Sequence, residues 1–270
     1  MTRNKILTLS ILLALNLLSL VLSETPKIAT GDDYPDPKEI SLYGVSGRPR
    51  YQDVQQIITK DCWLEATLAS IARVEFTRIM NMLKDNGDGT VEVNLYDQQG
   101  HPRSMNANKR GFLGNTLQNN SPSSTWIAVI QNAIDDLFRN DKFGNEAVHK
   151  NGGWPVWALK AIYGRSATWA YCTDPDINMT EVLRGGGSSP VLMSTVDAAH
   201  HNPLIDHHVY SVWGMKGSDT VILRNPWGSI GENVWGYTNK VKGATDLGEG
   251  IFELSLSNFL LGCYTITYFW

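Results

Sequence analysis

Three side chains in the sequence have the types and the order needed for covalent catalysis by a thiol: Cys62, His208 and Asn225. A cysteine thiolate is a strong nucleophile, an imidazole can take and return its proton, and a neutral amide can orient that imidazole. His208 lies 146 residues after Cys62, and Asn225 lies 163 residues after it. In one class of thiol hydrolases the two partners follow the cysteine by about 130–150 residues. The spacing therefore favours nucleophilic catalysis by Cys62.

Cys62 stands where a helix is expected to begin. From Cys62 to about Leu83, apolar side chains recur at steps of three and four residues, which predicts a helix with one buried stripe. Asp61, directly before this run, is a good N-cap residue. The free N–H groups and the dipole at a helix start favour an anion, so we expect a lowered pKa for the Cys62 thiol. Position alone also allows a buried, inert cysteine.

His208 and Asn225 lie in a part of the chain with strand and turn signals. Residues 207–213 read HHVYSVW, and strand alternation places the two histidines on opposite faces, so that only one of them faces a cleft. Residues 224–228 read RNPWG, a pattern that suits a turn after a strand. In the functional interpretation, the Asn225 carbonyl accepts the imidazole N–H and Trp227 shields that bond from water.

The rest of the chain changes character near its middle. Helical periodicity recurs in residues 126–138 and 156–163, whereas the second half contains short strand-like runs. These runs cover residues 168–171, 191–194, 209–213, 220–224 and 251–256. The segment 85–89 reads DNGDG and lacks the glutamate of a calcium loop, so it predicts a hairpin turn before a strand at 91–95. The pattern predicts an α+β fold with a mostly helical first lobe, a mostly β second lobe and a cleft between them.

The composition is that of a folded chain rather than a disordered or fibrous one. The chain has 270 residues, of which 42% are hydrophobic and 19% are charged. Its formal net charge of −4 argues against a nucleic-acid partner, because binding to phosphates requires a basic surface.

The first 23 residues have the layout of a secretory signal peptide. Two basic residues precede an apolar run over residues 6–22, and a small residue stands at the end. An uncleaved membrane anchor is the alternative, but 17 residues are at the lower limit for spanning a bilayer. Cleavage predicts a secreted chain with a formal net charge of −6. In an oxidising medium Cys172 and Cys263 could pair, although the sequence does not show whether they are close.

Several motifs around these residues resemble those of the calpain family of cysteine proteases. Residues 61–70 read DCWLEATLAS and resemble the helix that carries the family's nucleophile. Residues 208–212 read HVYSV, which selects His208 over its neighbour, and residues 224–228 match the family's asparagine motif. Gln56 stands six residues before the cysteine, where the family has the glutamine that donates to the oxyanion.

The resemblance covers about residues 44–270 and implies the protease core alone. It implies a papain-like α+β core with a cleft between a mostly helical first lobe and a mostly antiparallel β second lobe. Residues 126–137 resemble the helix that closes the first subdomain, and residues 250–261 resemble the closing strand and helix of the core. The predicted parts are a signal peptide at 1–23, an extended lead-in at 24–43, a first subdomain at 44–166 and a second subdomain at 167–270.

The resemblance also implies a role for each residue of the site. Cys62 is the expected nucleophile, and His208 the general base and then the general acid. Asn225 would orient His208, and Trp227 would lie on the substrate side. The Gln56 amide and the Cys62 N–H would stabilise the oxyanion. The expected reaction is endopeptide hydrolysis of protein or peptide substrates through an acyl-enzyme, by a monomer with no nucleic-acid partner and, after signal cleavage, no membrane partner.

No cofactor is required for this chemistry, but the resemblance raises calcium as a candidate ligand. Asp53 stands nine residues before the nucleophile, at the position of a calcium ligand in calpains. The partner glutamate of that site corresponds to Gln131, which offers only a neutral oxygen and would weaken binding. Glu232 is a looser counterpart in the second lobe.

Departures from the family pattern keep two other functions open. Ile57 and Lys60 stand where the family has glycines, and Lys60 adds a charge beside the nucleophile. Together with Gln131, they favour as the alternative a catalytically weak or inactive calpain-like module that binds peptides. An acyltransferase of the transglutaminase type also uses cysteine and histidine, but its third residue is usually aspartate rather than an asparagine such as Asn225.

Overall fold

The computed structural model describes residues 36, 38–56, 60–109, 124–141, 152–196, 203–231 and 241–269. All of them belong to one compact unit, Asp36–Trp270. The predicted signal peptide and most of the lead-in lie outside the described residues, as does Ile57. No helix in the described part of the chain is long and apolar enough to cross a membrane.

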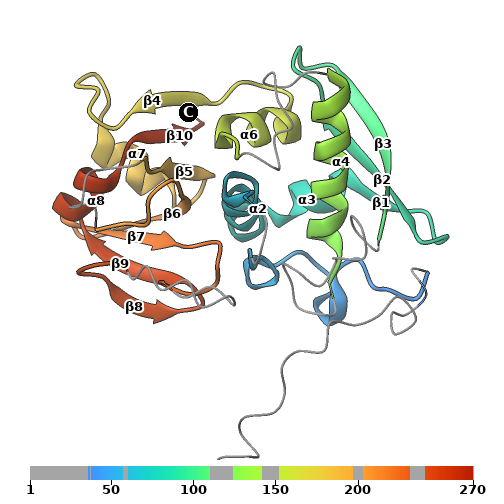
Figure 1. Ribbon diagram of the computed structural model, residues 1–270, viewed down its shortest axis with the longest axis horizontal. Helices are drawn as coiled ribbons and strands as arrows, with labels where there is room; N and C mark the ends of the chain where they lie inside the picture. The colour runs from blue at the N-terminus through green and yellow to red at the C-terminus, as the bar shows by residue number, and fades with distance from the viewer. Residues whose placement is uncertain are drawn as a thin grey trace, which may run out of the picture. The chain divides into compact units, whose positions relative to one another are not determined.

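The first half of this unit consists of helices and a small antiparallel sheet (Figure 1). Its helices are α2 (Cys62–Val74), α3 (Phe76–Met82), α4 (Trp126–Asp141) and α6 (Pro155–Tyr163), with short 3-10 turns at η1 (Gly44–Ser46) and η2 (Tyr51–Asp53). Its strands are β1 (Leu83–Asp85), β2 (Thr90–Tyr96) and β3 (Pro102–Asn108). The helix α4 packs against β2 and β3. The predicted hairpin turn is confirmed, because β1 and β2 pair antiparallel around it.

The helix predicted from Cys62 to about Leu83 is helical over most of its length but is interrupted, forming two helices, α2 and α3, with a break at Glu75. The chain leaves helical geometry at Glu75, which has φ −149° and ψ 52°, and Leu83 already belongs to β1. Apolar side chains continue at helical spacing across this break, so periodicity alone did not reveal it. The Glu75 carboxylate accepts the Tyr163 hydroxyl at 2.7 Å and pairs with Arg78, contacts that favour the break over a continuous helix.

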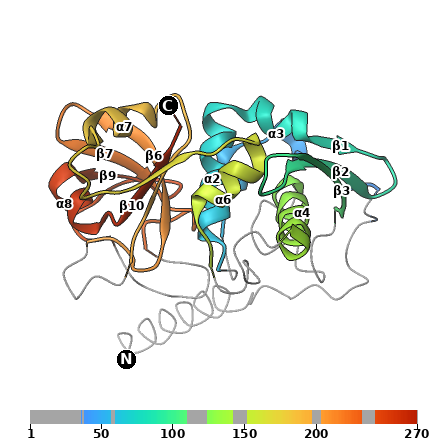
Figure 2. The same cartoon turned by 90° about the horizontal axis from the view of Figure 1, so that it is seen from above.

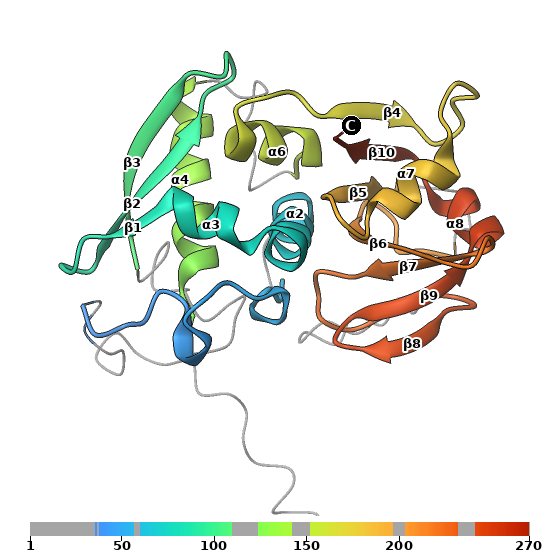
Figure 3. The same ribbon diagram turned by 180° about the vertical axis from the view of Figure 1, so that it is seen from behind.

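The second half forms a seven-stranded antiparallel sheet with the strand order β4-β10-β5-β6-β7-β9-β8. The strands are β4 (Thr168–Tyr171), β5 (Val191–Ser194), β6 (Val209–Lys216), β7 (Thr220–Arg224), β8 (Thr245–Gly248), β9 (Ile251–Ser255) and β10 (Thr265–Tyr268), and the helices are α7 (Met179–Gly185) and α8 (Leu256–Gly262). Figure 3 shows β7, β9 and β8 along one side of this sheet and β4 with β10 on the other. The five predicted strands are confirmed. Two strands were not predicted. β8 reads TDLG, is exposed throughout and has no apolar alternation, whereas β10 reads TITY, only four residues long, and is buried throughout. The predicted α+β class is therefore confirmed.

The helix α2 lies between the two halves and contacts both. It packs against α6 and η2 on one side and against β5 and β6 on the other (Figure 2). Leu192 of β5 and Val209 of β6 accordingly belong to the same buried apolar cluster as the α2 side chains. This packing brings the start of α2 next to the start of β6, that is, Cys62 next to the residues that follow His208.

One disulfide joins two segments of the second half. Cys172, just after β4, is bonded to Cys263, just before β10, and their Cα atoms are 5.8 Å apart, within the usual range for a disulfide. The structure thus decides a pairing that the sequence left open. Because the chain has three cysteines, Cys62 is its single free thiol.

Candidate active site

Cys62 is the first residue of α2, as predicted, but Asp61 does not cap the helix with its side chain. The Asp61 backbone carbonyl accepts the N–H groups of Leu64 and Glu65 at 2.8 and 3.0 Å, which begins the helix. Its carboxylate is buried and instead accepts hydrogen bonds from the side-chain amides of Gln56 and Gln131. Asp61 therefore occupies the predicted N-cap position, but its side chain makes no capping hydrogen bond, because two amides from outside the helix bind the carboxylate.

The Cys62 thiol lies against the backbone of β6, and Cys62 is partly buried. Burial, and then the negative charge of Asp61, raise the pKa of this thiol to about 12. The backbone N–H groups of Val209, Trp63 and Cys62 itself act in the opposite direction, since they stabilise a thiolate. The expectation of a lowered pKa at the helix start is wrong for this conformation, because desolvation outweighs the N–H groups. At neutral pH the thiol is protonated here.

His208 immediately precedes β6 and is the buried member of the histidine pair. Its Nε2 atom lies 2.8 Å from Oδ1 of Asn225. Burial lowers the pKa of His208 to about 4, although the bond to Asn225 acts in the opposite direction. His207 is exposed and has a positive φ of 49°, so the backbone turns its side chain away from that of its neighbour. The choice of His208 over His207 agrees with this geometry.

The orientation of Asn225 determines which imidazole nitrogen carries the proton. Its Oδ1 atom accepts the backbone N–H of Trp227 at 3.0 Å as well as facing the His208 ring. A backbone N–H is always a donor, so the amide oxygen, and not the amide nitrogen, must occupy this position. The nitrogen of His208 that faces Oδ1 therefore donates, and in the neutral ring Nδ1 is left as the acceptor.

Two aromatic rings contact His208, and a close backbone contact fixes the position of Asn225. The ring centroids of Trp227 and Tyr210 lie 4.8 and 5.0 Å from that of His208. The backbone N–H of Asn225 donates to the Gly250 carbonyl at 2.8 Å. Gly250 has φ +78°, and a Cβ atom there would lie 2.6 Å from the Asn225 carbonyl oxygen, so this approach requires glycine. Trp227 thus contacts the histidine itself, in agreement with its predicted shielding of the His–Asn bond.

Gln56 lies beside the turn that follows Asn225. Its backbone N–H donates to the Pro226 carbonyl at 2.8 Å, and its side-chain Nε2 donates to Oδ1 of Asp61 at 3.3 Å. The nearby Arg224 guanidinium, which is fully buried, donates to the Val54 carbonyl at 2.7 Å and ties the same segments together. The structure therefore places Asn225 and Trp227 against His208 and Gln56 against the Pro226 turn, and it places the Cys62 thiol against the backbone of Val209, the residue that follows His208.

The residues proposed for calcium do not fit that ion as they stand. Asp53 is buried, and its carboxylate accepts hydrogen bonds from Arg50 at 3.1 Å and from the Trp126 indole at 2.9 Å. A guanidinium and an N–H donor occupy the side where a cation would bind. Gln131 donates to Asp61 instead of approaching Asp53, and Glu232 lies outside the described residues. Within the described ranges, no three His, Cys, Asp or Glu side chains are grouped to hold a metal.

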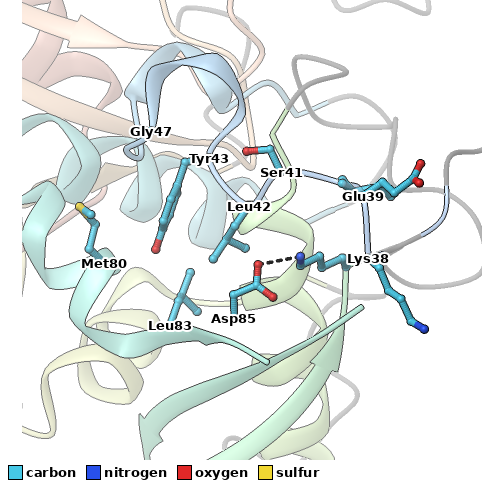
Figure 4. A pocket seen from close by; sticks show the side chains of 11 residues that line it. Lys38, Glu39, Ser41, Leu42, Tyr43, Gly47, Met80, Leu83 and Asp85 are labelled. Atoms are coloured by element: carbon cyan, nitrogen blue, oxygen red, sulfur yellow. Dashed lines mark ion pairs between the residues drawn. The ribbon is translucent and has the colours of Figure 1, made fainter. Parts of the chain in front are cut away.

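A cavity of about 530 Å³ lies elsewhere, between residues 38–43 and the α3–β1 segment (Figure 4). An ion pair of 2.7 Å between Lys109 and Asp85 lies in its wall. Burial, and then the charge of Asp85, raise the pKa of Tyr43 to about 12 in the same wall. The cavity includes none of the predicted catalytic residues.

The low pKa of His208 predicts an acid-sensitive fold. Between pH 6.5 and about 4 the unfolded chain binds a proton at this residue that the folded chain does not bind. The free energy of unfolding should therefore fall by about 3 kcal/mol as the pH is lowered through that window. Above the window the contribution of His208 to stability is complete. Urea unfolding at pH 7 and pH 4 measures this loss. In His208→Gln the loss should be smaller by about the same amount, whereas an equal loss in both chains would contradict the shift.

Sequence reasoning missed two residues of this site. Glu65, noted above only as part of the nucleophile motif, is fully buried and accepts from Gln131 at 2.7 Å. Arg224 belongs to the RNPWG motif, but its bond to Val54 depends on tertiary contact. The charged types of both residues within otherwise apolar segments were the available signal. The chain matches no family model, and no curated protein has a detectably similar sequence.

Proposed function

We propose that the chain is a secreted, calpain-like cysteine endopeptidase with a Cys62–His208–Asn225 triad. The observation that carries this proposal is the convergence of the three residues, together with the orientation of Asn225. His208 donates from the nitrogen that faces Asn225, which leaves its other nitrogen as an acceptor, and the Cys62 thiol interacts with the backbone N–H of Val209, the next residue. In the proposal that second nitrogen is the base for the thiol. The α+β architecture and the resemblance of three motifs to calpains also support it.

The protonation states suggest how the first step proceeds. Both the thiol and the imidazole are neutral at pH 7 in this conformation, because burial disfavours either charge. Attack on a peptide carbonyl is then coupled to transfer of the thiol proton to Nδ1 of His208. The sulfur–carbon bond forms as the carbonyl becomes an oxyanion, and the imidazolium is stabilised by the Asn225 oxygen.

The remaining steps use the same groups. The Cys62 backbone N–H and the Gln56 amide would donate to the oxyanion, each contributing at a point where charge develops. The imidazolium gives its proton to the leaving amine, which releases the first product and leaves a thioester on Cys62. Water, activated by His208, hydrolyses that thioester and restores the free thiol.

The test is turnover of a broad peptide library, together with labelling by a peptidyl epoxide. We expect cleavage products and one adduct per chain, located on Cys62 by mass spectrometry, since the other two cysteines are bonded to each other. His208→Ala is the matched control, because it keeps the thiol and removes the base. Iodoacetamide makes no peptide contacts, so it should react slowly at pH 7 with this protonated, partly buried thiol.

One observation favours a second function, that of a non-catalytic peptide-binding module. The resting thiol of Cys62 is partly buried and lies beside the negative charge of Asp61, both of which oppose a thiolate. If this module is correct, peptides bind to the chain while none is cleaved and the epoxide forms no adduct. Turnover that disappears in His208→Ala would exclude it.

A further inference from the structure

Two buried carboxylates behind the candidate nucleophile share one amide nitrogen. Asp61 and Glu65 stand one helical turn apart at the start of α2 and are 3% and 0% exposed. The Nε2 atom of Gln131, which comes from α4, donates to Oδ2 of Asp61 and also to Oε1 of Glu65. An amide nitrogen has two hydrogens, and here each carboxylate receives one of them.

A primary amide at position 131 satisfies both carboxylates without adding a charge, because its nitrogen has two hydrogens to donate. Like charges at positions i and i+4 of a helix repel each other, and burial strengthens that repulsion. A glutamate at position 131 would add a third carboxylate and remove both N–H donors, whereas an alanine would remove both donors without adding charge. Gln131 is therefore one of the donors that hold the Asp61 carboxylate, together with Gln56.

Asp61 in turn contacts the amide proposed to bind the oxyanion. Its second oxygen, Oδ1, accepts from Nε2 of Gln56 at 3.3 Å. The Gln56 backbone is already held by its bond to the Pro226 carbonyl, so side-chain rotation is the freedom that remains. Because a carboxamide is planar, the bond to Asp61 orients both N–H groups of Gln56 at once. The three side chains form a relay in the order Gln131, Asp61, Gln56.

We propose that Gln131 is a positioning residue for the reaction at Cys62. It holds Asp61 in the position from which Asp61 orients the Gln56 amide toward the oxyanion. This inference rests on the proposed function, since it concerns the rate of that reaction. Gln131 lies on α4 and is not part of the candidate triad. A change at this position should therefore affect kcat through Gln56.

The experiment is a double-mutant cycle between positions 131 and 56, measured as peptide turnover. Gln131→Glu should lower kcat about 10- to 100-fold with KM changed less than twofold, because a misplaced oxyanion donor affects the transition state more than substrate binding. In the Gln56→Ala background, the same change should lower kcat less than twofold. Asn132→Asp is the matched control, since it makes the same change of charge one residue along α4. It should leave kcat within twofold of the natural chain.

A second readout reports the relay without turnover. The side-chain amide protons of Gln56, identified by their absence in Gln56→Ala, should shift in the NMR spectrum of Gln131→Glu and not in that of Asn132→Asp. If Gln131→Glu does not fold, Gln131→Ala removes the donors without adding charge and takes its place. Additive effects at the two positions, or unchanged Gln56 amide protons, would overturn the inference and leave the protease proposal standing. Absence of turnover in the natural chain would overturn both.

Discussion

Cys62→Ala will lower kcat for peptide hydrolysis by about 10⁴-fold or more, the largest effect expected for any single change in this chain. The substitution removes the nucleophile, so no thioester forms and only binding and the oxyanion donors remain. Steady-state turnover of a peptide found in the library measures the loss. The side chain removed is small, and its polar contacts are with backbone N–H groups, so unfolding in urea should change little.

The partners of Cys62 provide the controls for this prediction. His208→Ala should reduce kcat by a similar factor, and the double variant should be no slower than either single variant, because the two groups act as one unit. Asn225→Ala should lower kcat by a smaller factor, because it leaves the imidazole in place and removes only the group that orients it. A Cys62→Ala chain that retained more than about one hundredth of the natural rate would exclude Cys62 as the nucleophile.

The second large effect concerns the disulfide. Replacing Cys172 and Cys263 together by alanine should lower the free energy of unfolding by about 2–4 kcal/mol, because the bond closes a loop with a sequence separation of 91 residues. Most of that stabilisation comes from restricting the unfolded chain. The change in urea midpoint between the natural and the double-alanine chain measures it.

A reducing agent provides an internal control for the disulfide. Reduction should lower the stability of the natural chain to about that of the double variant, and it should not change the double variant at all. Equal stability of the natural chain with and without reductant would contradict this prediction. The stability of the double-alanine chain also shows whether the protein stays folded in the reducing buffers in which thiol enzymes are usually assayed.

The sequence alone predicted the candidate catalytic residues and most of the elements that hold them. Cys62 begins a helix because apolar side chains recur at helical spacing from this point, and β6 follows His208 because residues 209–213 have strand propensity. These are local properties of the chain, so they can be predicted from the sequence without knowledge of the tertiary contacts. The same holds for the hairpin turn at 85–89 and for the α+β class.

Tertiary structure decided the properties that depend on neighbours distant in the sequence. The pKa of the Cys62 thiol is raised to about 12 by partial burial against β6 and then by the charge of Asp61, effects that helix position does not reveal. Asp61 contacts Gln56 and Gln131 rather than capping α2, since α4 brings a competing donor close to it. Burial and long-range hydrogen bonds are set by packing, and for that reason the electrostatics of the site could not be derived from the order of its residues.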